Sequence, residues 1–177
     1  EGKIRAIGVS NYSVEQMEEF RKTAELDTLQ PPYNLFEREV ENNELPYCEK
    51  NNITTLLYSS LCRGLLTGKM KPDTKWEGDD LRNVDPKFQN PRYDQYLYAV
   101  QQLDDYARQH HAKRVIHLAI RWILQQPGAH IPLWGGRKPE QMNPLDEMFG
   151  WELNETDLKE IDKIIGNTVK DPVGPEF

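Results

Sequence analysis

The stretch ITTLLYSSLCRGLLTGK, residues 53–69, joins an apolar run to a basic loop that contains two glycines. Its first part, Ile53 to Tyr58, is rich in β-branched and large apolar residues, as is typical of a buried strand. Its second part carries Arg63 and Lys69, separated by glycines that let backbone N–H groups approach a ligand closely. The stretch therefore predicts a buried strand whose carboxyl end opens into a candidate phosphate-binding loop.

Similar apolar runs recur along the chain, at Ile4 to Val9, around Thr28-Leu29 and at His130 to Trp134. Helical patterns lie between the runs, and this alternation predicts parallel strands with right-handed crossovers. Helices are expected after Ser13, near Glu39 with an interruption at Pro46, near Tyr93, at Val115, from Pro139 and after Asn154. The sequence thus predicts an α/β fold of four βα units with C-terminal helices, either a small open sheet or half of an eight-stranded parallel barrel.

One long connection interrupts this alternation. Residues 70–92 carry three prolines and many charges without sustained periodicity, which predicts an ordered loop or flap. At 177 residues with 37% hydrophobic residues, the chain has the size of a single domain with one core.

The composition also excludes several partners. The net charge of −7 disfavours a nucleic acid or an anionic membrane surface, because most of the chain repels a polyanion. No apolar run is long enough to span a membrane. Cys48 and Cys62 are the only cysteines, and without metal-ligand spacing they are interpreted as reduced thiols of a cytoplasmic protein. The four histidines likewise predict no metal site.

Polar residues stand at the carboxyl ends of the predicted strands, where ligands bind in parallel α/β folds. Ser10-Asn11, Gln30 and Tyr58 follow the first three strands, and Gly135-Gly136-Arg137-Lys138 follows the fourth. Side-chain amides suit recognition of a carboxamide, a tyrosine ring offers a stacking face, and the basic loops suit phosphates. A helix beginning at Pro139 would add its positive N-terminus to the second basic loop.

Each of these features also has a simpler interpretation. Ser10-Asn11 resembles an ordinary turn cap, and Tyr58 alone resembles a core aromatic residue. Basic residues such as Arg63 and Arg137 usually lie in solvent on the surface. The convergence of four polar strand ends on one rim favours the ligand interpretation.

Four motifs in order carry a family resemblance: Ile7 to Asn11, Gln30 to Asn34, Tyr58 to Lys69 and Pro132 to Gln141. Together they resemble the second half of an aldo-keto reductase, an NADPH-dependent (β/α)8 barrel. The likeness is closest to bacterial sugar-type reductases and to potassium-channel β subunits. It implies that residues 1–177 form a single partial domain, strands five to eight of a TIM-type barrel, with residues 70–92 as a long loop or flap.

The resemblance also implies roles for particular residues. The nicotinamide carboxamide would meet Ser10, Asn11 and Gln30, and Tyr58 would stack on the ring. The pyrophosphate would be lined by Ser59, Leu61, Arg63 and Lys69, and the adenosine side of NADPH by Gly136, Arg137, Lys138 and Gln141. Pro144 and Leu145 occupy the positions where the family usually closes the adenine pocket, so Asn143 or Asp146 would have to substitute.

The family's catalytic Tyr, Lys, Asp and His come from the first four βα units, and this chain has no matching motifs. The resemblance therefore implies an NADPH-dependent reductase of aldehydes or ketones, of which this chain supplies the cofactor half and no catalytic residue. Two exposed strand edges would pair with the missing N-terminal half or with a second copy. The alternatives are a non-catalytic, nucleotide-sensing subunit like the channel β subunits, or an inactive truncated product.

Overall fold

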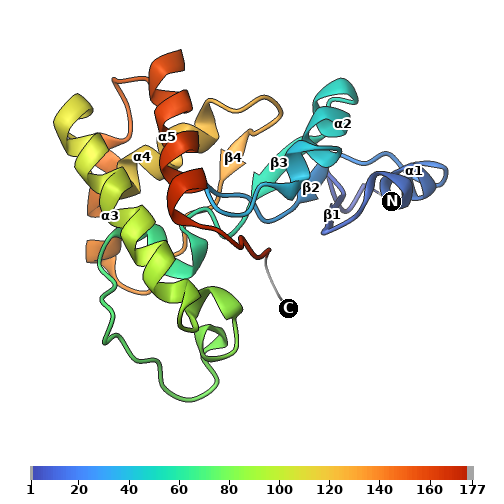
Figure 1. Ribbon diagram of the computed structural model, residues 1–177. Helices are drawn as coiled ribbons and strands as arrows, with labels where there is room; N and C mark the ends of the chain where they lie inside the picture. Colours follow the sequence, from blue (N-terminus) through green and yellow to red (C-terminus); the bar gives the residue numbers. More distant parts are fainter. Residues whose placement is uncertain (1, 175–177) are drawn as a thin grey trace.

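The computed structural model of the chain, described here for residues 2–174, contains one parallel sheet (Figure 1). Its strands are β1 (Gly8–Ser10), β2 (Thr28–Gln30), β3 (Thr54–Leu57) and β4 (Ile131–Pro132), in the spatial order β1-β2-β3-β4. Every neighbouring pair is parallel, with Val9 opposite Leu29 and Leu57 opposite Pro132. The predicted α/β alternation with a parallel sheet is thereby confirmed.

The first strand is shorter and later than predicted. The sequence favours a buried strand from Ile4 to Val9, but β1 begins at Gly8 and the Ile4 side chain is 68% exposed. Just before β1, the Ile7 carbonyl accepts a hydrogen bond from the Asp27 N–H at 2.9 Å. Because β2 is the only described strand beside β1, the apolar residues that precede Ile7 have no partner surface.

The α-helices are α1 (Val14–Arg21), α2 (Glu44–Lys50), α3 (Arg92–His111), α4 (Val115–Leu124) and α5 (Glu155–Thr168). Two of the expected caps are present. The Ser13 hydroxyl accepts from the Gln16 N–H at 3.3 Å, and the Asn154 side chain accepts from the Asp157 N–H at 3.0 Å. Short 3₁₀ turns complete the chain: η1 (Glu39–Glu41), η2 (Cys62–Thr67), η3 (Leu81–Asn83), η4 (Pro86–Phe88) and η5 (Pro139–Glu147).

The helix expected over residues 39–51 is divided into η1 and α2. Pro46 does not interrupt α2, because it lies in the first turn, where a backbone N–H has no partner within the helix.

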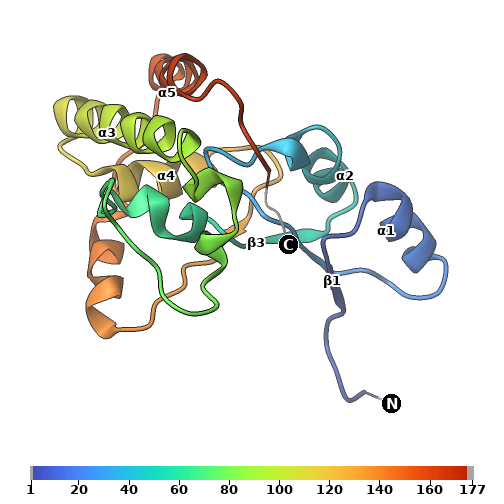
Figure 2. The same cartoon turned by 60° about the horizontal axis from the view of Figure 1, so that its bottom comes forward.

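Two hydrophobic clusters hold the layers together. The smaller one contains Met17, Leu26, Leu29, Cys48 and Ile53 and joins α1 and α2 to the first strands. The larger one is centred on α3 and α4 and includes Tyr33, Leu57, Leu65 and Trp122. Figures 1 and 2 show the corresponding arrangement, with α1 and α2 at one end of the molecule and α3, α4 and α5 at the other.

One face of the sheet is buried and the other is not. Leu29 and Leu57 point to the buried face and are 0% exposed. Their neighbours Gln30 and Leu56 point to the opposite face and are only half-buried, while Ser10 is exposed. Parallel sheets are normally covered on both faces. In this sheet, the face that carries Gln30 and Leu56 is not covered by any helix among residues 2–174.

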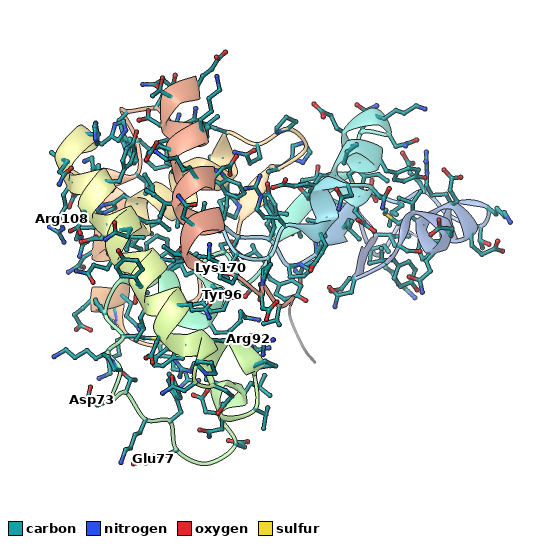
Figure 3. All side chains as sticks on the ribbon, viewed as in Figure 1. Asp73, Glu77, Arg92, Tyr96, Arg108 and Lys170 are labelled. Carbon is teal, nitrogen blue, oxygen red and sulfur yellow. The ribbon has the colours of Figure 1, made fainter. Side chains whose placement is uncertain are left out.

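The long segment 70–92 is ordered at its base. Its outer part carries Asp73 and Glu77, which lie away from the helices in Figure 3. Nearer the core, the Trp76 ring packs edge-on against Phe88 and Tyr93, with ring centroids 5.2 and 5.6 Å apart, and η3 and η4 follow. The second half of this segment is therefore part of the packed structure.

Candidate functional site

The first three strand ends meet through hydrogen bonds. The Ser10 hydroxyl donates to the Gln30 carbonyl at 2.9 Å, and the Asn11 N–H donates to the same carbonyl at 3.1 Å. The Tyr58 hydroxyl donates to Asn11 Oδ1 at 3.1 Å. Asn11 has a φ of 57°, a left-handed conformation that asparagine tolerates better than most residues and that ends the strand at this point. Ser10, Asn11, Gln30 and Tyr58 thus share one rim.

Tyr58 is fixed at both ends. Its N–H donates to the Pro31 carbonyl at 3.0 Å, its carbonyl accepts from the Tyr33 N–H at 3.1 Å, and its hydroxyl reaches Asn11. The ring is half-buried, and burial raises the pKa of the phenol. A neutral, half-exposed ring held in this way can act as a stacking surface.

The segment after β3, residues 59–69, is called the β3 loop below. Most of it lies in η2, and it contains an unusual set of left-handed residues: Ser59, Cys62, Arg63, Gly64 and Gly68. The Leu61 carbonyl accepts from the N–H groups of Gly64 and Leu66, which closes the turn. Lys69, at the end of the loop, is exposed. Consecutive left-handed residues depart from the backbone conformation that L-amino acids prefer, so the shape of this turn depends on its surroundings.

Arg63 is not a solvated surface charge. Its side chain is 17% exposed, and its Nε lies 3.1 Å from Asp85 Oδ2. The other oxygen of Asp85 lies 3.2 Å from Lys87 Nζ, which in turn lies 2.8 Å from Glu37 Oε1. We call Glu37, Arg63, Asp85 and Lys87 the buried charge cluster, since all but Arg63 are at most 1% exposed in their side chains.

Sequence reasoning missed three members of this cluster. Glu37, Asp85 and Lys87 lie in segments that carry no motif, and the last two belong to what was expected to be a loop or flap. Nothing in the sequence indicated that these charged residues are buried, because charged residues usually lie at the surface. Only the tertiary fold brings them beneath the β3 loop.

The second basic loop, residues 135–141, follows β4 and is called the β4 loop. Gly136, Arg137, Lys138 and Gln141 are all exposed. The Gln141 side-chain oxygen accepts from the N–H groups of Arg137 and Lys138 at 2.7 and 2.9 Å, so this residue shapes the loop. The helix expected from Pro139 is the 3₁₀ turn η5. Further along it, Pro144 is buried and Asn143, Leu145 and Asp146 are exposed.

Arg82 links the β3 loop to the neighbouring segment. Its guanidinium donates to the Arg63 carbonyl at 3.3 Å and pairs with Asp80. The side-chain hydrogen bond from Arg82 is the main cause that lowers the pKa of Asp80 to about 2, and the charge of Arg137 in the β4 loop makes a smaller contribution. Burial raises the pKa of the Cys62 thiol well above its usual value, although Arg63 follows it in the chain.

Residues 2–174 contain neither a metal site nor a membrane-spanning helix. No group of three or more His, Cys, Asp or Glu side chains there is arranged to hold a metal ion. Within the same residues, no helix is both long and apolar enough to cross a membrane.

Comparison with known proteins decides the family. The sequence profile described as "Aldo/keto reductase family" matches residues 1–166. The chain belongs to the aldo/keto reductase family. The resemblance expected from the four motifs is thereby confirmed, and the (β/α) barrel type of this family agrees with the parallel sheet.

Individual members of the aldo/keto reductase family are also similar. "Aldo-keto reductase YhdN" of Bacillus subtilis is 65% identical over 176 residues, which cover 99% of this chain and 53% of the relative. "NADH-specific methylglyoxal reductase" of Escherichia coli is 32% identical, covering 89% of this chain and 47% of the relative. The solved glycerol dehydrogenase AKR11B4 from Gluconobacter oxydans is 49% identical with a TM-score of 0.90, covering 99% of this chain and 53% of that one. The chain thus spans about half the length of these relatives.

Proposed function

We propose that this chain supplies the cofactor-binding half of an aldo/keto reductase that uses NADPH to reduce a small aldehyde or ketone to an alcohol. The observation that carries the proposal is the rim on which Ser10, Asn11, Gln30 and Tyr58 meet through bonds of 2.9 to 3.1 Å. Amide groups from two strands and a fixed aromatic ring form a set that suits a carboxamide-bearing planar ring.

The basic loops fit the charged part of the same cofactor. The β3 loop combines left-handed backbone with Arg63 and Lys69, which suits a pyrophosphate. The β4 loop presents Arg137 and Lys138 in solvent, which suits the additional 2′-phosphate of NADPH. Ser59, Leu61, Gly136 and Gln141 complete the proposed contact set. Bound NADPH would supply the hydride, and the residues of this chain would bind and orient it.

The half-barrel part of the proposal has separate support. The four strands run in sequential order and all in parallel, one sheet face lacks cover, and Ile131 of β4 is 46% exposed. We propose that these are strands five to eight of the barrel, and that the missing N-terminal half, or a second copy of this chain, pairs with the open edges. The catalytic Tyr, Lys, Asp and His would belong to that half, which leaves this chain inactive alone.

The names of two relatives suggest a class of substrate. Two of them are named for glycerol and methylglyoxal, small and polar molecules, so we propose a small carbonyl compound as the substrate of the intact protein. Their names are those of dehydrogenases and reductases, which favours an enzyme over the nucleotide-sensing alternative. We propose a cytoplasmic location, because both buried cysteines are free thiols.

The test is a titration of the purified chain with NADPH, followed by nicotinamide fluorescence, with NADH in parallel. Saturable binding that is tighter for NADPH and is weakened by Tyr58→Ala supports the proposal. Equal weak binding of both nucleotides contradicts the NADPH preference. No binding at millimolar NADPH contradicts a cofactor role for this chain by itself.

A further inference from the structure

The buried charge cluster has four charges and a net charge of zero. Glu37 and Asp85 face Lys87 and Arg63, at distances of 2.8 to 3.2 Å. Burial disfavours the charged form of Lys87, but its attraction to Glu37 and the hydrogen bond that it donates to Glu37 outweigh that effect and raise the pKa of the ammonium. Lys87 therefore stays charged at neutral pH and completes its shell by donating to the Gly174 carbonyl at 2.9 Å.

The cluster joins four segments that are far apart in the chain. Glu37 follows β2, Arg63 lies in the β3 loop, and Asp85 and Lys87 belong to the long segment 70–92. Gly174 is part of the C-terminal segment, which contacts the first turns of α3, and Figure 3 shows the labelled Tyr96 and Lys170 near each other. This segment is fixed there by the Val173 N–H, which donates to the Tyr96 hydroxyl at 3.2 Å.

The β3 loop is attached to the cluster at two points. Arg63 is bound directly by Asp85. Asn34 supplies the second attachment, because its side-chain amide donates to Glu37 Oε2 at 2.6 Å and to the Ser59 carbonyl at 3.0 Å. The start of the loop is thus fixed to Glu37 through Asn34, and its middle is fixed through Asp85, which lies 3.2 Å from Lys87 Nζ.

Stability alone does not account for such a cluster. Replacing buried ion pairs with apolar residues of similar size is often neutral or stabilising, because the charges must be removed from water. In some proteins buried charged groups instead fix one geometry. That matters most beside a loop with three consecutive left-handed residues, Cys62, Arg63 and Gly64, whose shape is not one that the backbone prefers.

We propose that Glu37 and Lys87 are positioning residues that hold the β3 loop in the shape that binds the nucleotide phosphates, without contacting the nucleotide themselves. The inference rests on the proposed cofactor role of this loop. A loop that is already fixed loses less conformational freedom when the phosphates bind. The cluster should therefore raise the affinity for NADPH by keeping the β3 loop ordered.

The test compares four forms of the 177-residue chain: wild type, Glu37→Gln, the charge-neutral double variant Glu37→Gln/Lys87→Met, and Asp157→Asn as a control. Asp157 is also buried, but its partners are Tyr106, His111 and the start of α5. Two quantities are measured for each form. One is hydrogen exchange at the amides of Cys62, Gly64 and Leu66, relative to amides of α4. The other is the NADPH dissociation constant.

For the double variant we expect exchange in the β3 loop to accelerate about tenfold or more while α4 changes little, and NADPH affinity to fall by about tenfold. Glu37→Gln, which is the milder change, should shift both quantities in the same direction. Asp157→Asn should lower the melting temperature without either effect, which separates positioning from general destabilisation.

Two results overturn the inference. One is an unchanged rate of hydrogen exchange in the β3 loop of the double variant, whether or not its NADPH affinity changes. The other is faster loop exchange with unchanged NADPH affinity. If the wild-type chain binds no NADPH, the proposed function fails separately, and the exchange measurement alone decides whether the cluster orders the loop.

Discussion

The β3 and β4 loops have similar compositions but are held in different ways. Each combines glycine with two basic residues at the end of a parallel strand. In the β3 loop, Arg63 is 17% exposed and bound to a buried carboxylate. In the β4 loop, Arg137 and Lys138 are exposed, and a single side chain, Gln141, shapes the backbone.

The difference follows from the surroundings of the two strands. β3 lies between two strands, and the segment 70–92 folds back beneath the loop that follows it. β4 is an edge strand whose Ile131 is 46% exposed, so its loop has fewer neighbours. One composition can therefore give a loop that is held by buried charges in one place and a loop of solvated charges in another.

The largest expected effect tests whether the buried charge cluster supports the β3 loop. Lys87→Met leaves Glu37 and Asp85 as neighbouring buried carboxylates without their shared cation. We expect the free energy of unfolding to fall by about 3–5 kcal/mol, measured by urea denaturation. The matched control is Lys163→Met, because Lys163 pairs with Glu160 at 3.0 Å but is 64% exposed, and we expect it to change stability by less than about 0.5 kcal/mol. Equal effects of the two substitutions would contradict the comparison.

The next prediction concerns one glycine of each loop. Gly64 has a φ of 90°, where an added Cβ is strained even though its nearest contact is at 3.4 Å. We expect Gly64→Ala to destabilise by about 1–2 kcal/mol. Gly136 lies outside the left-handed region, and an added Cβ would be too close to the flexible end of Met142 but at ordinary distance from Gln141, so Gly136→Ala should be nearly neutral. Thermal denaturation of both variants measures the difference, and a larger loss for Gly136→Ala contradicts the assignment of strain.

The β4 loop should matter for binding and not for stability. Arg137→Ala should weaken NADPH binding by about tenfold, because a charge-assisted contact to phosphate contributes about 1.5–3 kcal/mol, while NADH binding and the melting temperature stay the same. Fluorescence titration with both nucleotides measures this. Lys159→Ala removes another exposed charge, on α5, and should change neither affinity. A loss of NADH binding of the same size would mean that Arg137 does not contact the 2′-phosphate.

The smallest effect concerns Asp80, which pairs with Arg82 between the two loops. The folded pKa of Asp80 is about 2, below its ordinary value of 3.8, so its charge stabilises the fold at higher pH. That contribution should be fully present above about pH 5 and lost as the pH falls toward 2. Because the pair is partly exposed, Asp80→Asn should lose about 1 kcal/mol or less at pH 7. Denaturation at pH 7 and pH 3 measures the difference in the free energy of unfolding between wild type and variant, which should be smaller at pH 3. A larger difference at pH 3 would contradict the prediction.

Local signals predicted much of the fold. Apolar runs identified all four strands, and the caps at Ser13 and Asn154 marked the start of α1 and α5. The convergence of Ser10, Asn11, Gln30 and Tyr58 could be expected from topology, because parallel strand ends meet at one edge. Local signals were less successful where neighbours decide the outcome, as at Ile4, which is apolar but exposed, and at Pro46, which lies in the first turn of α2 and does not interrupt the helix.

The sequence by itself determined the α/β class, the family and the residue types at the strand ends, because periodicity and short motifs are local properties of the chain. Only the tertiary structure decided what each basic residue is bound to. Arg63 and Arg137 look alike in the sequence, but one is bound by Asp85 above a buried lysine and the other faces solvent. The reason is physical: the partner of a buried charge is set by which distant segments pack together, and no local pattern records that packing.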